Sequence, residues 1–191
     1  GGVFLQMLYD RAVWKQWASR DMTKAAKWAP FSAPIPKATK TVTVVPTSEK
    51  KPVAWRYTTQ VPSKNWAAPE FDASAWKEGP GGFGTKGTPG AVVRTEWNTP
   101  QIWLRREFVM PEGNWDDLKL RLHHDEDAEV YVDGLPAAQV TGFVTDYEPV
   151  RIRSKAKDQL KPGKHVLAVH CKQTGGGQYI DAGLVDLREL N

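Results

Sequence analysis

The stretch Leu118–Gly134, LKLRLHHDEDAEVYVDG, carries the clearest fold signal in the 191-residue chain. Its first five residues alternate between apolar and charged side chains, which is the period of a strand with one buried face. A second alternating run, 129–132, leads into Asp133-Gly134, a pair that favours the positive φ angles of a two-residue hairpin turn. We therefore expect two strands that form a hairpin spine, joined by the polar loop 123–127.

Further short strands are predicted from β-branched, aromatic and apolar runs that are separated by Gly, Pro, Asn or Asp. The predicted strands cover residues 41–45, 55–59, 102–109, 137–140, 147–152, 165–171 and 179–187. The run 165–171 has apolar side chains at both odd and even positions, so both faces of the strand should be buried and it should be a central strand. Many short strands, frequent turns and almost no helix over this part of the chain indicate an all-β fold, a β-sandwich.

The N-terminal part of the chain has a different character. Residues 3–20 read as helix, because Val3, Phe4, Met7 and Leu8 form one apolar stripe that Val13, Trp14 and Trp17 continue. Residues 29–52 contain five prolines among Lys and Thr, which is typical of an extended linker. We expect 1–28 to be the last helices of a truncated helical domain, or alternatively a helix packed on the β-domain itself. Residues 53–191 would form the sandwich.

Charge and composition exclude several classes of function. The net charge is +4, but residues 1–64 carry 11 Lys or Arg against 3 Asp or Glu, so the basic excess lies outside the predicted sandwich. No nucleic-acid reader motif accompanies it, and we expect no nucleic-acid partner. No apolar segment of membrane-spanning length occurs, so no membrane partner is expected either. Cys171 is the only cysteine, and its place in an apolar strand predicts an inert, buried thiol.

The acidic loop is the first candidate site. Asp125, Asp127 and Glu129 share one parity, and loop carboxylates suit a structural Ca²⁺ ion, although the spacing of an EF-hand is absent. A solvated, salt-bridged loop and a polar ligand site remain alternatives. Asp125 and Glu129 could also form a carboxylate pair for glycoside hydrolysis. Zinc is not expected, because adjacent His123 and His124 point to opposite faces of a strand; a histidine paired with a nearby carboxylate is favoured.

Sugar binding is the second candidate chemistry. It needs a flat aromatic ring that stacks on the sugar and polar groups that bind the hydroxyls. Trp97 lies in a polar loop between Glu96 and Asn98, so it is the favoured platform. The other ligand-binding candidates on the predicted rim are His123, His124, Asp125, Tyr147, Gln178 and Tyr179. By contrast, Trp66, Trp76 and Trp103 are expected to be core residues.

Four segments, taken in order, resemble a known family of modules. They are Trp66…Phe71-Asp72-x-Ser74-x-Trp76, Trp103-Leu104-Arg105-Arg106-x-Phe108, Glu129–Gly134, and Leu160-x-Pro162-Gly163-Lys164-x-x-Leu167-Ala168-Val169. This series is similar to the galactose-binding-like jelly-roll domains found in family 2 glycoside hydrolases and many other carbohydrate-active enzymes. The resemblance covers residues 55–187 and implies a jelly-roll β-sandwich. It does not specify a ligand.

A second resemblance spans the whole chain. The opening Gly1-Gly2-Val3-Phe4, the segment Trp14-Lys15-x-Trp17-Ala18, the Pro-rich joint and the ending His170-x-x-x-Thr174-Gly175-Gly176-Gly177-Gln178-Tyr179-Ile180-Asp181 look like the C-terminal part of bacterial glutaminase A-type proteins. It implies that 1–28 end a helical toroid domain and that the parent protein is exported, secreted or periplasmic. No catalytic residue of that family can be matched here.

These observations predict a non-catalytic accessory domain of an exported hydrolase that binds carbohydrate. Its second partner would be the helical catalytic domain of the same parent chain. Two alternatives remain open: a purely structural domain that packs on the helical body, and a glutaminase or glycosidase fragment with a site of its own. No cofactor is expected apart from the structural calcium. No catalytic residue is assigned.

Overall fold

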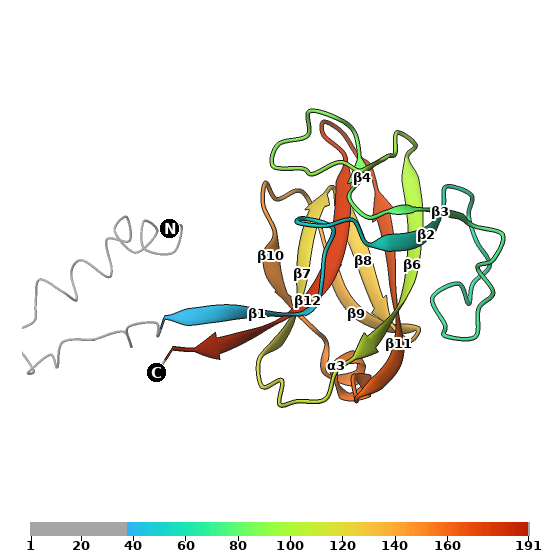
Figure 1. Ribbon diagram of the computed structural model, residues 1–191. Helices are drawn as coiled ribbons and strands as arrows, with labels where there is room; N and C mark the ends of the chain where they lie inside the picture. The colour runs from blue at the N-terminus through green and yellow to red at the C-terminus, as the bar shows by residue number, and fades with distance from the viewer. Residues whose placement is uncertain (1–37, 191) are drawn as a thin grey trace, which may run out of the picture. The chain divides into compact units, whose positions relative to one another are not determined.

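A computed structural model describes residues 38–190. These residues form two six-stranded sheets that face each other as a sandwich (Figure 1). The first sheet has the order β10-β7-β12-β4-β5, with β1 also paired to β12, and the second has the order β3-β2-β6-β11-β8-β9. The predicted all-β sandwich is therefore confirmed.

The strands of the first sheet are β1 (Thr39–Val45), β4 (Phe83–Gly84), β5 (Thr95–Glu96), β7 (Leu118–Asp125), β10 (Glu148–Arg151) and β12 (Tyr179–Glu189). Those of the second sheet are β2 (Ala54–Thr58), β3 (Lys77–Pro80), β6 (Gln101–Met110), β8 (Asp127–Val132), β9 (Leu135–Val140) and β11 (Gly163–Lys172). One short helix, α3 (Ser154–Gln159), precedes β11. Within 38–190, no helix is long and apolar enough to span a membrane.

The core follows the alternation of the strands. Leu120 and Leu122 of β7 face Leu104 of β6 and Val169 of β11 across the sandwich interior, and all four are fully buried. Strand β11 lies between β6 and β8, so its predicted central position is confirmed. Cys171 is buried in this strand, and burial raises the pKa of its thiol, which keeps it protonated and unreactive.

The stretch Leu118–Gly134 spans both layers of the sandwich. Strand β7 belongs to the first sheet and β8 to the second, so the chain changes layer at Glu126. The prediction that these two strands form one hairpin is wrong, because each pairs with a strand that comes later in the sequence. The Asp-Gly turn itself is confirmed: Asp133 and Gly134 have φ angles of 48° and 78°, and they join β8 to β9.

The first strand lies inside the range predicted as a linker. The strand expected over 41–45 is present as β1, begins at Thr39 and pairs antiparallel with the end of β12. Together the two strands form a ribbon that projects from the sandwich (Figure 1). Leu190 N–H donates to the Ala38 carbonyl at 2.8 Å, so the ribbon is closed at its outer end. The helices predicted over 1–28 lie outside the described residues, and the division into domains stays a prediction.

Candidate functional site

Trp97, the predicted sugar platform, is a core residue. Only 2% of its surface is exposed, and its indole N–H donates to Thr99 Oγ1 at 2.9 Å. The reason is the short strand β5, which pairs in parallel with β4 and turns the ring inward. The prediction of an exposed ring is therefore wrong, although neighbouring Glu96 and Asn98 are exposed. A strand of two residues is too short for its alternation to be seen in the sequence.

Three other predicted site residues do come together. His123, Tyr147 and Tyr179 meet on the outer face of the first sheet, where His123 lies directly opposite Asp181 on β12. The Tyr147 and Tyr179 hydroxyls are 3.0 Å apart, and Tyr147 donates to Asp181 Oδ2 at 2.7 Å. We call His123, Tyr147, Tyr179, Asp181 and Ser48 the covered cluster.

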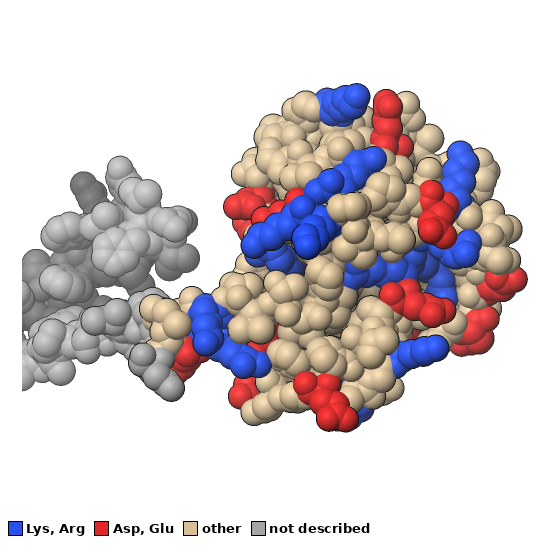
Figure 2. All heavy atoms as spheres, viewed as in Figure 1, with Lys and Arg blue, Asp and Glu red and all other residues tan. Residues whose placement is uncertain are grey.

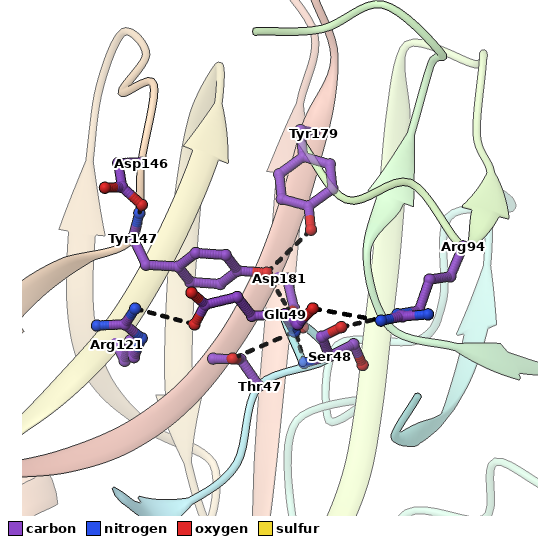
Figure 3. Close-up of polar contacts among 9 residues, drawn as sticks. All are labelled: Thr47, Ser48, Glu49, Arg94, Arg121, Asp146, Tyr147, Tyr179 and Asp181. Atoms are coloured by element: carbon purple, nitrogen blue, oxygen red, sulfur yellow. Dashed lines mark hydrogen bonds and ion pairs between the residues drawn. The ribbon is translucent and has the colours of Figure 1, made fainter. Parts of the chain in front are cut away.

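Asp181 is the centre of the covered cluster, and the sequence did not single it out. In Figure 3, Tyr147 and the Ser48 backbone point toward its carboxylate. Ser48 N–H donates to Oδ2 at 2.6 Å, and Ala182 N–H donates to Oδ1 at 3.0 Å. A carboxylate inside a strand of small and apolar residues was the available signal, since a buried acid needs several donors.

Burial dominates the electrostatics of the covered cluster. It raises the pKa of Asp181 to about 6, against the hydrogen bonds from Tyr147 and Ser48 that lower it. Burial also raises the pKa values of Tyr147 and Tyr179, so both hydroxyls stay protonated and can donate. It lowers the pKa of His123, whose two ring nitrogens find no hydrogen-bond partner among the described residues. A neutral imidazole is therefore expected there.

Loops seal the covered cluster from solvent. Arg94 Nε donates to the Ser48 carbonyl at 2.7 Å, and Arg121 binds the Glu49 carboxylate at 2.9 Å (Figure 3). The Arg121 guanidinium also lies 5.1 Å from the centre of the Tyr147 ring. Every member of the cluster is less than a tenth exposed, so a sugar could reach it only if these loops moved. The arrangement is that of a structural polar network.

The remaining predicted rim residues hold loops in place. Gln178 Nε2 donates to the Thr99 carbonyl at 2.7 Å, and His124 Nδ1 lies 2.7 Å from the Glu126 carbonyl and 3.0 Å from the Gly142 carbonyl. Asp125 is buried at the end of β7, where burial, followed by the charge of Glu126, raises its pKa. None of these three side chains presents a free polar group on an open surface.

The predicted calcium site is not formed. No group of three or more His, Cys, Asp or Glu residues between 38 and 190 could hold a metal ion. Asp125 belongs to the first sheet, whereas Asp127 and Glu129 lie on β8 in the second, because strand parity is not maintained through the change of layer. Asp127 Oδ1 accepts the Gly142 N–H at 2.9 Å, and Lys172 lies opposite Asp127. The proposed glycosidase pair Asp125 and Glu129 is separated for the same reason.

The outer face of the second sheet carries aromatic and charged side chains. His170 stacks on Trp103 with 4.6 Å between ring centres, and Glu129 Oε2 lies 3.4 Å from its Nδ1. The pairing with a carboxylate that was predicted beside the acidic loop is not found at His123, which has no hydrogen-bond partner among residues 38–190, or at His124 Nδ1, which lies against backbone carbonyls. It is found at His170 and at His165, whose Nδ1 lies 2.6 Å from Asp133 Oδ2. Trp103 is buried on this outer face, and Trp66 and Trp76 are partly buried with it, so these rings do not lie between the sheets.

An open hollow lies on the same outer face, over β2 and β6. This open groove has a volume of about 460 Å³. It is lined by Ala54, Trp55, Arg56, Phe71, Asp72, Ala73, Ser74, Glu78, Arg105, Arg106 and Glu107. Figure 2 shows Lys and Arg atoms beside Asp and Glu atoms where β2 and β6 lie, so neither sign of charge dominates. The sequence analysis did not predict this site, although Arg105-Arg106 inside an apolar strand was a usable signal.

One wall of the open groove is held by a buried arginine. Arg105 Nη1 donates to the carbonyls of Trp66 and Ala68 at 2.6 and 2.8 Å, and Nη2 donates to Pro69 and Phe71 at 3.4 and 3.3 Å. These bonds fix residues 66–71 against the sheet. The guanidinium also lies 5.4 Å from the centre of the Phe71 ring. Burial lowers the pKa of Arg105, although nearby Glu107 and Glu70 oppose that shift.

Comparisons with known proteins give matches in structure alone. No family model matches the sequence, and no curated protein sequence matches it. A glycosyl hydrolase family 2 member from Bacteroides cellulosilyticus is 14% identical, with a TM-score of 0.51 over 75% of this chain and 20% of that one. A β-glucuronidase from Bacteroides uniformis is 18% identical, with a TM-score of 0.50 over 78% of this chain and 18% of that one.

These matches establish the fold. At such low identity they show that the chain shares its β-sandwich with one part of family 2 glycoside hydrolases, and it spans about a fifth of their length. Both named structures are glycosidases, so the resemblance to glutaminase A-type proteins gains no support from them. The chain is similar to a portion of these enzymes that accounts for a fifth of each.

Proposed function

We propose that this chain is a non-catalytic accessory domain of a glycoside hydrolase and that it binds carbohydrate in the open groove. The observation that carries the proposal is the groove itself, about 460 Å³ in volume, which is lined by two aromatic and six charged residues. Sugar sites combine an apolar surface with side chains that exchange hydrogen bonds with hydroxyls, and this volume is typical of ligand pockets.

The groove adjoins a second hollow. A second hollow of about 480 Å³ is lined by Pro52, Ala54, Glu78, Gly79 and Pro80, and it shares Ala54 and Glu78 with the first. An oligosaccharide could therefore lie across both hollows. Weak binding at such a site would gain from attachment to an enzyme that acts on the same polymer, because tethering raises the effective concentration.

A blocked groove tests this function. Ala54 is exposed on the floor, so Ala54→Trp would fill the groove without disturbing the core. Calorimetric titration of the full chain with neutral oligosaccharides should show millimolar or tighter binding that Ala54→Trp removes. Thr43→Trp, at an exposed strand position of the first sheet, is the matched control and should bind normally. Failure to bind any neutral, amino or acidic oligosaccharide would disprove the proposal.

A purely structural domain is the second candidate. It is favoured by the burial of Trp97, Tyr147 and Tyr179, which leaves the rim without the aromatic platforms that the sequence suggested. In that case the titration would show no binding, and the domain would instead stabilise the helical body of its parent. Export of the parent to the periplasm or the medium, with that helical body as partner, is part of both proposals.

A further inference from the structure

We infer that the open groove selects sugars that donate hydrogen bonds, with amino sugars bound most tightly and uronic acids rejected. This inference rests on the proposed function, because it names the class of carbohydrate for the same site. Two arginines of the groove are bonded to the protein and the third has buried donors, whereas the three carboxylates of the groove are exposed.

Two arginines of the groove, Arg105 and Arg56, donate to backbone carbonyls of the protein. Both Nη groups of Arg105 are shared among four backbone carbonyls. Arg56 Nη1 donates to the carbonyls of Ala73 and Ser74 at 3.5 and 3.2 Å, and its Nη2 lies 3.9 Å from Glu78 Oε2. An anionic ligand would have to compete with these bonds for each guanidinium.

Arg106 is withdrawn from the groove surface. Its Nε and Nη1 are buried and have no hydrogen-bond partner among residues 38–190, and the guanidinium lies 4.9 Å from the centre of the Trp55 ring. Burial lowers the pKa of Arg106 to about 10, which still leaves it charged at neutral pH, and the carboxylate of Asp181 opposes the shift. The charge of Arg106 is thus opposed in part by that of Asp181, and its buried Nε and Nη1 are not presented on the groove surface.

The carboxylates of the groove, unlike Arg105 and Arg106, are exposed to solvent. Asp72, Glu78 and Glu107 are all exposed along the groove, and the side chain of Glu78 is 62% exposed. The backbone of Glu107 pairs with Val166 in the sheet, but its side chain forms no hydrogen bond or ion pair among residues 38–190, although its charge acts on nearby Arg105. Asp72 accepts the Ser74 N–H at 2.8 Å, and this bond lowers its pKa, so the group is ionised at neutral pH. The free hydrogen-bonding capacity of the groove is therefore mostly that of an anionic acceptor.

A ligand must supply hydrogen-bond donors, because the exposed side chains of the groove are mostly acceptors. Sugar hydroxyls can donate to carboxylates, and a protonated amine adds charge complementarity to its hydrogen bonds. The carboxylate of a uronic acid only accepts. It would meet three exposed carboxylates and one exposed arginine, Arg56, which already pairs with Glu78, and this selects against it. The expected order of affinity is therefore amino sugar, neutral sugar, uronic acid.

Three trisaccharides of the same β1→4 linkage test this order: those of glucosamine, glucose and glucuronic acid. In calorimetric titrations of the full chain at pH 6, the glucosamine trimer should bind about tenfold more tightly than the glucose trimer. The glucuronic acid trimer should bind at least about tenfold more weakly than the glucose trimer. Ala54→Trp should remove binding of all three.

Glu107→Gln separates charge from shape. It should reduce the advantage of glucosamine over glucose by about threefold and change glucose binding by less than about twofold. Glu148→Gln, at an exposed position on β10 outside the groove, is the matched control and should change neither. Glucuronic acid bound as tightly as glucose would overturn the inference and leave the proposed function standing. Binding of no trimer would overturn both.

Discussion

The two outer faces of the sandwich treat polar side chains in opposite ways. On the first sheet, Asp181, Tyr147 and His123 lie beneath loops, and Asp181 accepts hydrogen bonds from Tyr147 and from the backbone. On the second sheet, Arg56, Glu78 and Glu107 line an open groove, and all three are exposed. A polar residue on the outside of a strand therefore indicates function only where no loop folds over it.

Removal of the Asp181 carboxylate should lower the free energy of unfolding more than any other substitution proposed below. It would show how far the covered cluster stabilises the fold. Asp181→Ala leaves the donors of Ser48, Ala182 and Tyr147 buried without an acceptor. We expect a loss of about 3–5 kcal/mol in the free energy of unfolding, measured by urea denaturation. Asp158→Ala, on the exposed side of α3, should cost less than about 0.5 kcal/mol. A cost as small for Asp181→Ala would mean that water already enters the cluster.

The loop over His123 can be tested through a pair of glycines. Gly90 has a φ of +70°, and a Cβ there would overlap with the Thr145 carbonyl oxygen. Gly87, in the same loop, has a φ of +91° but open space around it. Gly90→Ala should therefore cost about 3 kcal/mol, whereas Gly87→Ala should cost about 1 kcal/mol, both by urea denaturation. Equal costs would contradict a tightly seated loop.

The pH dependence of stability reports on Asp181. Because its pKa is raised to about 6 in the folded protein from 3.8, the folded state binds the proton more tightly than the unfolded state. The stabilisation that the folded protein gains from this tighter proton binding is on the order of 3 kcal/mol. It is fully present below about pH 4 and is lost as the pH rises through 6. The difference in unfolding free energy between the parent chain and Asp181→Asn should decrease over this range. A flat difference would show that burial does not perturb the carboxyl.

On the open face, the groove wall depends on Arg105. Lysine cannot serve four carbonyls with one ammonium, so Arg105→Lys should cost about 2 kcal/mol. Hydrogen exchange should accelerate in residues 66–71 and leave β7 and β12 protected. Faster exchange in both sheets would indicate that the wall and the sandwich unfold as one unit.

The smallest change in the free energy of unfolding is expected for substitution of the groove carboxylates. Glu107→Gln should change the free energy of unfolding by less than about 0.5 kcal/mol, because the side chain is exposed. Thermal unfolding of the variant and the parent chain should coincide. A clear destabilisation would assign Glu107 to the structural network and weaken its role as a free ligand group.

The sequence predicted the strands better than the sites. Alternation in 118–122 and 129–132 and the apolar run 165–171 are local properties, and they identified strands whose buried faces form the core. The covered cluster joins Ser48 to Asp181, residues 133 apart, through loops whose course no local pattern determines. The covering of His123 by the Tyr147 loop therefore could not be predicted, and neither could the inward turn of Trp97.

The ribbon of β1 and the end of β12 has a mechanical consequence. Ala38 and Leu190 leave the sandwich side by side, joined by a single hydrogen bond, and the pairs from Thr39↔Glu189 inward follow in order. Tension applied at Ala38 and Leu190 would therefore separate the paired residues of the ribbon one pair after another, starting at its outer end. It would not load many hydrogen bonds at the same time. Under such tension these outer pairs would separate first, while the two sheets of the sandwich keep their structure.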